Sequence, residues 1–328
     1  MTEVALRAKV SAMSVSRALR TPHQVSPETL RRVQKAVREM GYVPNRLAGG
    51  LKAPSRTQLA AAIVPSLQNS LFSGTIQGVT DALRKKGINL MLGDSHYSHE
   101  EEESLIGAFL AHRPCGLVLH DTAHTPGARR LLRNAGIPVI EIGNLVPRPV
   151  DLVVSYSNFA AAKAMTGHLI GRGYRQLAFV GLPSADNERS KERQRGFRAA
   201  LADGHLPYDE TRVIETDGSF ESGARALAQL LDMRPRIDAI FFTGGVTAVG
   251  AMMECTRRGW DVPKKVAIAA FDDWAVSHLL KTPITALEIP RYQIGARAAE
   301  LMLRRLDGDH GRIPPVDVGF RVIERQST

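Results

Sequence analysis

The sequence is poor in the residues that metal sites, disulfide frameworks and membrane spans require. It has two cysteines, Cys115 and Cys255, and they match no metal-binding or redox spacing. No apolar run approaches the roughly 20 residues that cross a bilayer. The first residues form a charged amphipathic segment rather than a signal peptide. We therefore expect two buried thiols, no metal, no cofactor, no membrane contact and a cytoplasmic location.

Sequence motifs of common enzymes are missing as well. The chain contains no G-x-G-x-x-G fingerprint and no P-loop. Its ten histidines are scattered, and the two close pairs, His96 with His99 and His120 with His124, have no third ligand at a suitable spacing. We expect no catalytic residue. One alternative stays open here, namely a sugar-processing enzyme or a ligand-binding protein on a Rossmann-like core.

Positive charge is concentrated at the start of the chain. Residues 1–56 contain 11 Lys or Arg against 3 Asp or Glu, so they carry +8 of the net charge of +10. The rest of the chain carries only +2. A local excess of this kind is typical of a surface that binds nucleic-acid phosphates.

The basic segment predicts two short helices joined by a tight turn. Two apolar groups recur at helical spacing: Val4, Ala5 and Ala8, then Val15, Ala18 and Leu19. Ser11 can cap the second helix, because its hydroxyl accepts from the free N–H groups of the first turn. Four residues of this helix face away from the apolar stripe: Ala12, Met13, Ser16 and Arg17. Small side chains with one guanidinium fit a DNA major groove.

A third helix has start and stop signals in the right order. Ser26 is a capping residue, Pro27 suits the first helical position, and Gly41 suits the position after the end. Its predicted buried face consists of Leu30, Val33, Val37 and Met40. Periodicity alone would fit any small amphipathic three-helix domain. The concentration of charge favours DNA binding.

Five segments in this region, in order and without gaps, resemble the headpiece of the lactose/galactose-repressor family. They are Glu3-Val4-Ala5, Val10-Ser11, residues 15–19, residues 25–29 and residues 41–48. The resemblance implies base-reading positions at Ala12, Met13 and Arg17, with Ser11 and Ser16 beside them. It also implies a hinge helix from Asn45 to about residue 52, with Leu51 wedged into the minor groove, where such a side chain kinks the duplex.

Two departures from the family pattern carry physical consequences. Lys9 stands where the family usually has the turn glycine, so the turn must be made by a residue with a Cβ. Gly49 and Gly50 lie in the predicted hinge helix, and each costs roughly 1 kcal/mol relative to alanine. We therefore expect the hinge to be unfolded away from DNA.

The chain after residue 57 alternates short apolar runs with amphipathic segments. The predicted strands are 59–64, 88–92, 116–119, 137–142, 177–180, 212–215, 239–242 and 266–271. The predicted helices are 76–86, 100–112, 126–135, 159–172, 190–202, 220–232, 246–258 and 292–306. Continuously apolar strands between helices predict an α/β fold with doubly wound parallel sheets. Because one sheet would be unusually wide, we expect two stacked subdomains.

The family resemblance covers this part too and implies a two-lobed, periplasmic-binding-protein-like core. The expected domains are a headpiece (1–44), a hinge and linker (45–56) and a core (57–328). Within the core we expect one lobe at about 57–154 and 284–312, and the other at about 155–283 and 313–328. Three segments most resemble the gluconate-operon repressor branch: residues 63–69, His124-Thr125-Pro126 and residues 135–139.

Polar residues that follow the predicted strands are candidates for a ligand cleft. In open α/β sheets, ligands bind beyond the carboxyl ends of the strands. The candidates after the strands are Ser66, Asn69, Ser95, His96, His120, Asp121, Asn144, Ser184, Thr243, Asp272 and Asp273, and His124, from a segment that resembles the gluconate branch, is a further candidate. The alternative for each is a loop polar group without a ligand.

The family resemblance adds specific roles to two cleft residues. It implies that Arg193 bonds the effector and that Asp272 bonds a sugar hydroxyl. An arginine can meet a carboxylate with two parallel hydrogen bonds, so a sugar acid such as gluconate, or its phosphate, is the expected effector. Thr243-Gly244-Gly245 stands where relatives usually have an Asn-Asp pair, which widens the cleft. We expect a homodimeric transcriptional repressor that binds a palindromic operator.

Overall fold

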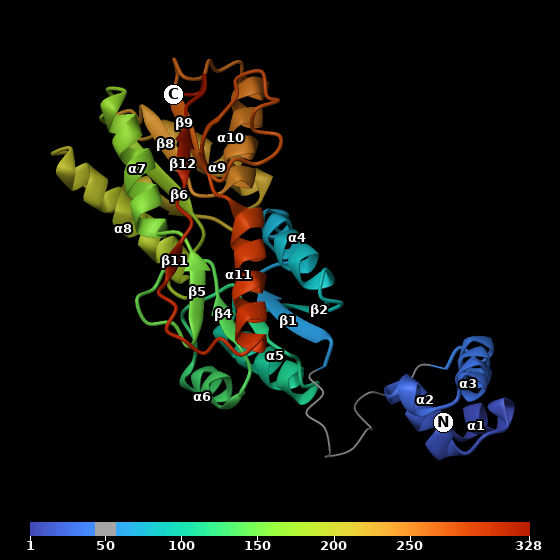
Figure 1. Ribbon diagram of the computed structural model, residues 1–328. Coiled ribbons are helices and arrows are strands. Elements are labelled where there is room, and N and C mark those ends of the chain that lie inside the picture. Colours follow the sequence, from blue (N-terminus) through green and yellow to red (C-terminus); the bar gives the residue numbers. More distant parts are fainter. Residues whose placement is uncertain (43–56) are drawn as a thin grey trace. The chain divides into compact units, whose positions relative to one another are not determined.

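The computed structural model describes residues 1–42 and 57–328 (Figure 1). Contacts within the chain divide it into two compact units, Met1–Thr57 and Gln58–Thr328. The described part of the first unit has these helices: α1 (Thr2–Ala8), α2 (Ala12–Arg20), the 3-10 helix η1 (Pro22–Gln24) and α3 (Pro27–Glu39). The three α-helices lie where the apolar stripes predict them.

Serine residues cap the second and third helices, as the sequence predicts. The Ser11 hydroxyl accepts a hydrogen bond from the Ser14 N–H at 3.1 Å. The Ser26 hydroxyl accepts one from the Thr29 N–H at 3.2 Å. Each bond satisfies an N–H group that the first helical turn leaves without a partner. Both helices therefore begin at defined residues, which fixes the face that each one buries.

Lys9 makes the turn between α1 and α2 in the left-handed conformation. Its φ of 52° and ψ of 48° lie in the region that favours glycine. The Arg32 side chain donates to the Lys9 carbonyl at 2.8 Å and so ties this turn to α3. The predicted turn without glycine is confirmed.

The first unit has a small apolar core of its own. Its buried members come from all three α-helices: Val4, Ala5, Ala8, Val15, Ala18, Val33 and Ala36. One predicted core residue is wrong, because Met40 is 39% exposed. It follows the last helical turn of α3, and Ala36, one turn earlier, faces the core in its place.

The second unit is built from two six-stranded sheets. Its strands are β1 (Leu59–Val64), β2 (Asn89–Asp94), β3 (Leu117–Leu119), β4 (Val139–Glu141), β5 (Leu152–Ser155), β6 (Leu177–Gly181), β7 (Val213–Glu215), β8 (Ala239–Phe242), β9 (Ala267–Phe271), β10 (Thr285–Glu288), β11 (Val316–Asp317) and β12 (Arg321–Ile323). The sheet orders are β11-β5-β4-β3-β1-β2 and β12-β10-β9-β8-β6-β7. Neighbouring strands pair in parallel except β10 with β12. The predicted α/β class with two doubly wound subdomains is confirmed.

Helices cover the two sheets. They are α4 (Leu71–Arg84), α5 (His99–Ala111), α6 (Pro126–Asn134), α7 (Asn158–Gly171), α8 (Glu188–Asp203), the 3-10 helix η3 (Glu210–Arg212), α9 (Phe220–Leu231), α10 (Gly245–Arg258) and α11 (Arg291–Leu306). Figure 1 shows α4 beside α11 along the first sheet, and α7 beside α8 along the second. We call the parts around these sheets the first and second lobe.

The predicted lobe boundaries are wrong at places after residue 283 where the chain passes from one lobe to the other. Residues 284–288 were expected in the first lobe, but β10 pairs with β9 in the second sheet. Residues 313–328 were expected in the second lobe; β11 instead pairs with β5 in the first sheet, whereas β12 pairs with β10 in the second, as expected. Because β10 extends the parallel order of the second sheet, the chain crosses only after it has completed that strand.

Glycines bring α4 and α11 into direct contact. A Cβ at Gly295 would lie 1.9 Å from the Thr75 carbonyl oxygen, and one at Gly78 would lie 2.1 Å from the Tyr292 carbonyl oxygen. Only residues without side chains permit this approach. The predicted helix at 76–86 in fact begins at Leu71, and part of its surface is used for this packing within the chain.

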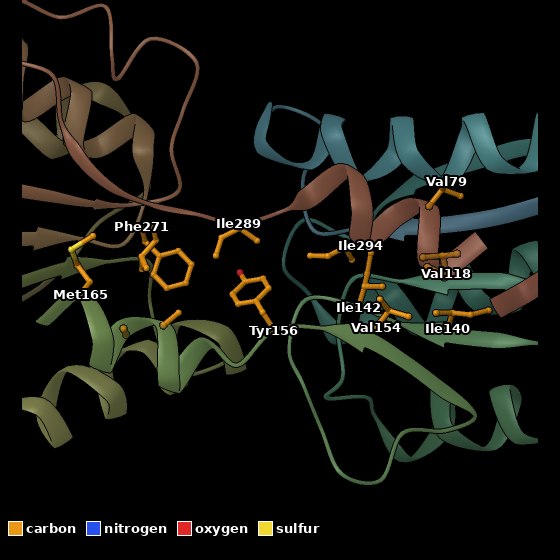
Figure 2. Close-up of a cluster of buried hydrophobic side chains, with 14 of the residues drawn as sticks. Val79, Val118, Ile140, Ile142, Val154, Tyr156, Met165, Phe271, Ile289 and Ile294 are labelled. Carbon is orange, nitrogen blue, oxygen red and sulfur yellow. The ribbon is translucent and has the colours of Figure 1, made fainter. Parts of the chain in front are cut away.

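The largest hydrophobic cluster continues from one lobe into the other. Figure 2 shows Tyr156, Phe271 and Ile289 between a group in the first lobe, which includes Ile142 and Val154, and Met165 in the second. Tyr156 is 2% exposed and Phe271 is fully buried. The crossing segments therefore share one apolar core, and the polar residues of the cleft lie beside it.

Candidate DNA-binding surface and ligand cleft

The outward face of α2 carries the residues expected to read DNA. Ala12, Met13 and Arg17 are exposed, with Met13 at 65%. Ser16 is half-buried, and Ser11 uses its hydroxyl to cap the helix. This face is open to a partner, while the opposite side of α2 packs into the core of the first unit. The other predicted DNA contacts, Asn45 and Leu51 with the hinge helix, lie outside the described residues.

Arg193 lies where α8 faces the ends of the strands of the second lobe. Its Nε donates to Asn158 Oδ1 at 2.8 Å, its Nη1 to the Thr243 carbonyl at 2.9 Å, and its Nη2 to the Tyr156 hydroxyl at 3.3 Å. The guanidinium also stacks on Phe271, with 3.7 Å between its carbon and the ring centre. All these partners are neutral. Within the described residues, no carboxylate compensates the charge of Arg193.

Arg189 lies one helical turn before Arg193 and reaches across to the first lobe. Its Nη1 donates to the His120 carbonyl at 2.8 Å and to Asp121 Oδ2 at 3.1 Å. Burial raises the pKa of Asp121, but Arg189 and two backbone N–H groups outweigh it and hold the pKa below its usual value. Further bonds between the lobes join Thr122 to Glu188 at 2.5 Å and Trp274 Nε1 to the Ser70 hydroxyl at 3.1 Å.

Arg291 and Asp272 form a second ionic link between the lobes. Arg291 is the first residue of α11, and Asp272 follows β9 with a left-handed φ of 79°. Arg291 Nε donates to Asp272 Oδ1 at 3.0 Å, and Nη2 donates to the same oxygen. Burial opposes the charge of Arg291, but Asp272 and Tyr156 raise its pKa. A cavity of about 400 Å³ borders this pair and is lined by Leu71, Asp272, Asp273 and residues 288–293; Arg193 is not among its lining residues.

His120 lies in the middle of these arginines. Its ring meets the edge of Phe72, with 4.6 Å between ring centres, and its Nδ1 has no hydrogen-bond partner among the described residues. Burial first, and then the charges of the three arginines, lower the pKa of His120 well below 6.5. The imidazole is therefore neutral at pH 7.

His124, a predicted cleft residue, does not reach the cleft. Its side chain has no exposed surface, and both ring nitrogens are bonded: Nδ1 to Glu102 at 2.6 Å and Nε2 to Glu141 at 3.3 Å. Burial opposes the charged form, but the two glutamates raise the pKa of His124 to about 9. The prediction that His124 contacts the effector is wrong, because Glu102 and Glu141 already bind both nitrogens of its ring.

The remaining predicted cleft residues make local contacts. The Ser66 hydroxyl accepts from the Gln68 N–H at 3.2 Å, and Asn69 Oδ1 accepts from the Leu71 N–H at 3.1 Å. Both shape the loop before α4. Thr243 contributes its backbone carbonyl to Arg193, while its hydroxyl donates to the Val180 carbonyl at 3.2 Å.

The glycine pair after Thr243 lies beside Trp274. A Cβ at Gly245 would lie 2.9 Å from the Trp274 Cβ, so Trp274 occupies part of the space that the missing side chains leave. Both predicted cysteine assignments are confirmed, since Cys115 and Cys255 are buried thiols. Among the described helices, none is both long and apolar enough to cross a membrane. In the part of the chain that the structure describes, no group of three or more His, Cys, Asp or Glu side chains could hold a metal ion.

Comparisons with known proteins agree with this geometry. Residues 1–45 match the bacterial regulatory proteins of the lacI family, and residues 166–328 match a periplasmic binding protein-like domain. The HTH-type transcriptional regulator GntR of Pseudomonas aeruginosa is 37% identical over the whole chain and 95% of its own length. The chain belongs to the LacI family. The HTH-type transcriptional regulator GntR of Escherichia coli K12 is 32% identical over 98% of this chain and 96% of its own length.

A solved LacI-family regulator from Silicibacter pomeroyi superposes on this LacI-family chain with a TM-score of 0.92. It is 28% identical, and the match covers 99% of this chain and 98% of that one. The relatives are DNA-binding transcriptional regulators, so this chain is a regulator and not an enzyme. Regulators of this family bind operator DNA and small-molecule effectors, and the predicted family and GntR-like branch are confirmed.

Sequence reasoning missed several cleft residues of this LacI-family regulator: Tyr156, Asn158, Arg189 and Arg291. Arg189 could have been found, because it precedes Arg193 by four residues and therefore shares its helix face. Tyr156 and Asn158 follow β5, a strand whose short apolar run we did not assign. No sequence pattern indicated that Arg291 is a cleft residue, since only the order of the second sheet brings α11 to the end of β9.

Proposed function

We propose that this regulator is a repressor of sugar-acid catabolism, whose operator affinity is controlled by gluconate or a related sugar acid in the cleft between the lobes. It acts in the cytoplasm as a homodimer on an approximately palindromic site. The observation that carries the effector proposal is Arg193, a guanidinium held by neutral partners and without a carboxylate partner among the described residues. Such a group is a ready partner for a carboxylate.

The start of α10 supports an anionic ligand at the same place. Thr243, whose carbonyl binds Arg193, is followed directly by the helix N-terminus, and no side chain caps it. The first N–H groups of a helix and its dipole favour a negative charge. A carboxylate between Arg193 and this helix end would be bound by both.

A dimer follows from the size of the DNA-reading face. One short helix contacts only a few base pairs, and a single headpiece buries too little surface for tight specific binding. Two copies place two α2 helices in successive major grooves and require a site with approximate two-fold symmetry.

Control by the effector follows from the contacts between the lobes. Arg189 with Asp121, and Arg291 with Asp272, hold one arrangement of the lobes. An effector changes DNA affinity only if it binds one arrangement more tightly than the other. A sugar acid that meets Arg193 in the second lobe and polar groups of the first distinguishes the two arrangements.

Selection from a pool of random duplexes tests the proposal. The full-length protein should enrich a common palindrome, and gluconate or 6-phosphogluconate in the binding step should reduce its recovery. Enriched sites without two-fold symmetry would contradict the dimer. Recovery that neither compound changes would contradict the sugar-acid effector.

A further inference from the structure

The pair of Arg291 and Asp272 decides which charge a ligand meets in the cleft. The Asp272 side chain is 4% exposed, and the Arg291 side chain is 14% exposed. Asp272 receives two hydrogen bonds from Arg291 on a single oxygen. A buried carboxylate without such a partner would be strongly destabilising. As long as the pair is closed, Asp272 is compensated.

Arg193 lies near this pair, because the Tyr156 hydroxyl is hydrogen-bonded to both Arg193 and Arg291. Its guanidinium is stacked on Phe271, and Asp272 is the next residue of the chain. Arg189 and Arg291 each have a carboxylate partner, whereas the partners of Arg193 among the described residues are neutral. If Arg291 were lost, Arg193 would be the cation available to Asp272.

We propose that Arg291 determines the charge class of the ligand: by holding Asp272, it leaves Arg193 free for a carboxylate, so the cleft selects a sugar acid over a neutral polyol of the same length. The proposal rests on the proposed function, in which a sugar acid is the effector. Without Arg291, Asp272 turns to Arg193, and the protein's own carboxylate fills the anion site. Both ligands lose any hydroxyl contact of Asp272 alike, so the preference between them reports the loss of the anion site.

Isothermal titration of the full-length protein with gluconate and with sorbitol tests this. Sorbitol has the same carbon chain and no carboxylate. Arg291→Met should reduce the preference for gluconate over sorbitol at least tenfold. Adding Asp272→Asn should restore most of that preference, because an amide cannot neutralise Arg193.

Three results would overturn the proposal. An unchanged preference in Arg291→Met would show that Asp272 does not reach Arg193. An equal loss of both ligands would show a merely structural role. A double variant that stays as weak for gluconate as Arg291→Met would show that Arg291 contacts the ligand itself.

A second measurement does not depend on the effector. If the wild-type protein binds neither compound, the sugar-acid function fails, and the pairing is tested by an NMR titration of the His120 ring. Arg291→Met should raise the pKa of His120, because one cation is lost and Asp272 compensates Arg193. In the double variant, the pKa of His120 should be lower than in Arg291→Met. Equal values in the single and double variants would overturn the proposal.

Discussion

The guanidinium carbon of Arg193 lies 3.7 Å from the centre of the Phe271 ring. The contact joins α8 to the end of β9 and fixes the plane of the guanidinium. Phe271 is fully buried, so the packing around its ring restricts its movement. Asn158 and Thr243 hold the same group from two sides. Arg193 is thus a preorganised positive charge, and a ligand that uses it needs to order little of the protein.

Replacing Arg17 with alanine should abolish specific operator binding while the fold remains intact. Arg17 is exposed on the outward face of α2, so it contributes nothing to the core of the first unit. A base-reading arginine is worth about 1–3 kcal/mol of discrimination. Lys264→Ala, which removes an equal charge from an exposed residue of the second lobe, should leave operator affinity unchanged. Specific binding by Arg17→Ala in a mobility-shift assay would refute the assignment of α2.

Replacing Arg193 with alanine should leave operator binding in place and remove the response to gluconate. Arg195→Ala is a matched control, because Arg195 lies on the same helix but is 62% exposed and pairs with Glu192. That variant should respond like the wild type. Operator binding measured over a gluconate series separates the outcomes. A normal response in Arg193→Ala would move the effector site elsewhere.

Replacing Gly295 with alanine should destabilise the second unit. The new methyl group would meet the Thr75 carbonyl oxygen, which belongs to the backbone of α4. Forcing an atom into a packed interface costs about 1–3 kcal/mol. Gly107→Ala in α5 should instead stabilise by about 0.4–1 kcal/mol, since open space surrounds that position. Urea unfolding followed by circular dichroism measures both, and equal midpoints would contradict the close packing of α4 on α11.

The stability of the core should fall as the pH rises from 6.5 towards 9. The pKa of His124 is raised to about 9 in the fold, above its value of 6.5 in the unfolded chain. Its stabilising contribution, up to about 3 kcal/mol, is therefore complete below pH 6.5 and lost as the pH passes 9. His124→Gln should remove this pH dependence, while His310→Gln at an exposed position should keep it. Thermal unfolding measured from pH 6 to pH 9.5 tests this. The same pH dependence of the unfolding temperature in both variants would contradict the account.

The elements that could be predicted are those with local signals. The apolar runs at 59–64 and 239–242 match β1 and β8 at both ends, and Ser26 with Pro27 marks the start of α3. The strands that were missed are short. β11 has two residues, one of them charged, and its place in the first sheet depends on β5, far away in the sequence. No local pattern encodes such a pairing.

The cleft shows the same division between local and distant information. Asp272 could be named from its place after a predicted strand and Arg193 from the family resemblance, but their partners could not. His120 and His124 are four residues apart and were treated alike, yet one faces three arginines and the other lies between two glutamates. Glu102 and Glu141 decide that difference, and they come from α5 and β4.

Fluorescence anisotropy of a labelled palindrome with a central C-G step tests the central claim most directly. The full-length protein is titrated at fixed salt, alone and with gluconate or 6-phosphogluconate. We expect tight binding that at least one of these sugar acids weakens. Weak, salt-sensitive binding, or tight binding that neither compound changes, would contradict an operator-binding repressor controlled by a sugar acid.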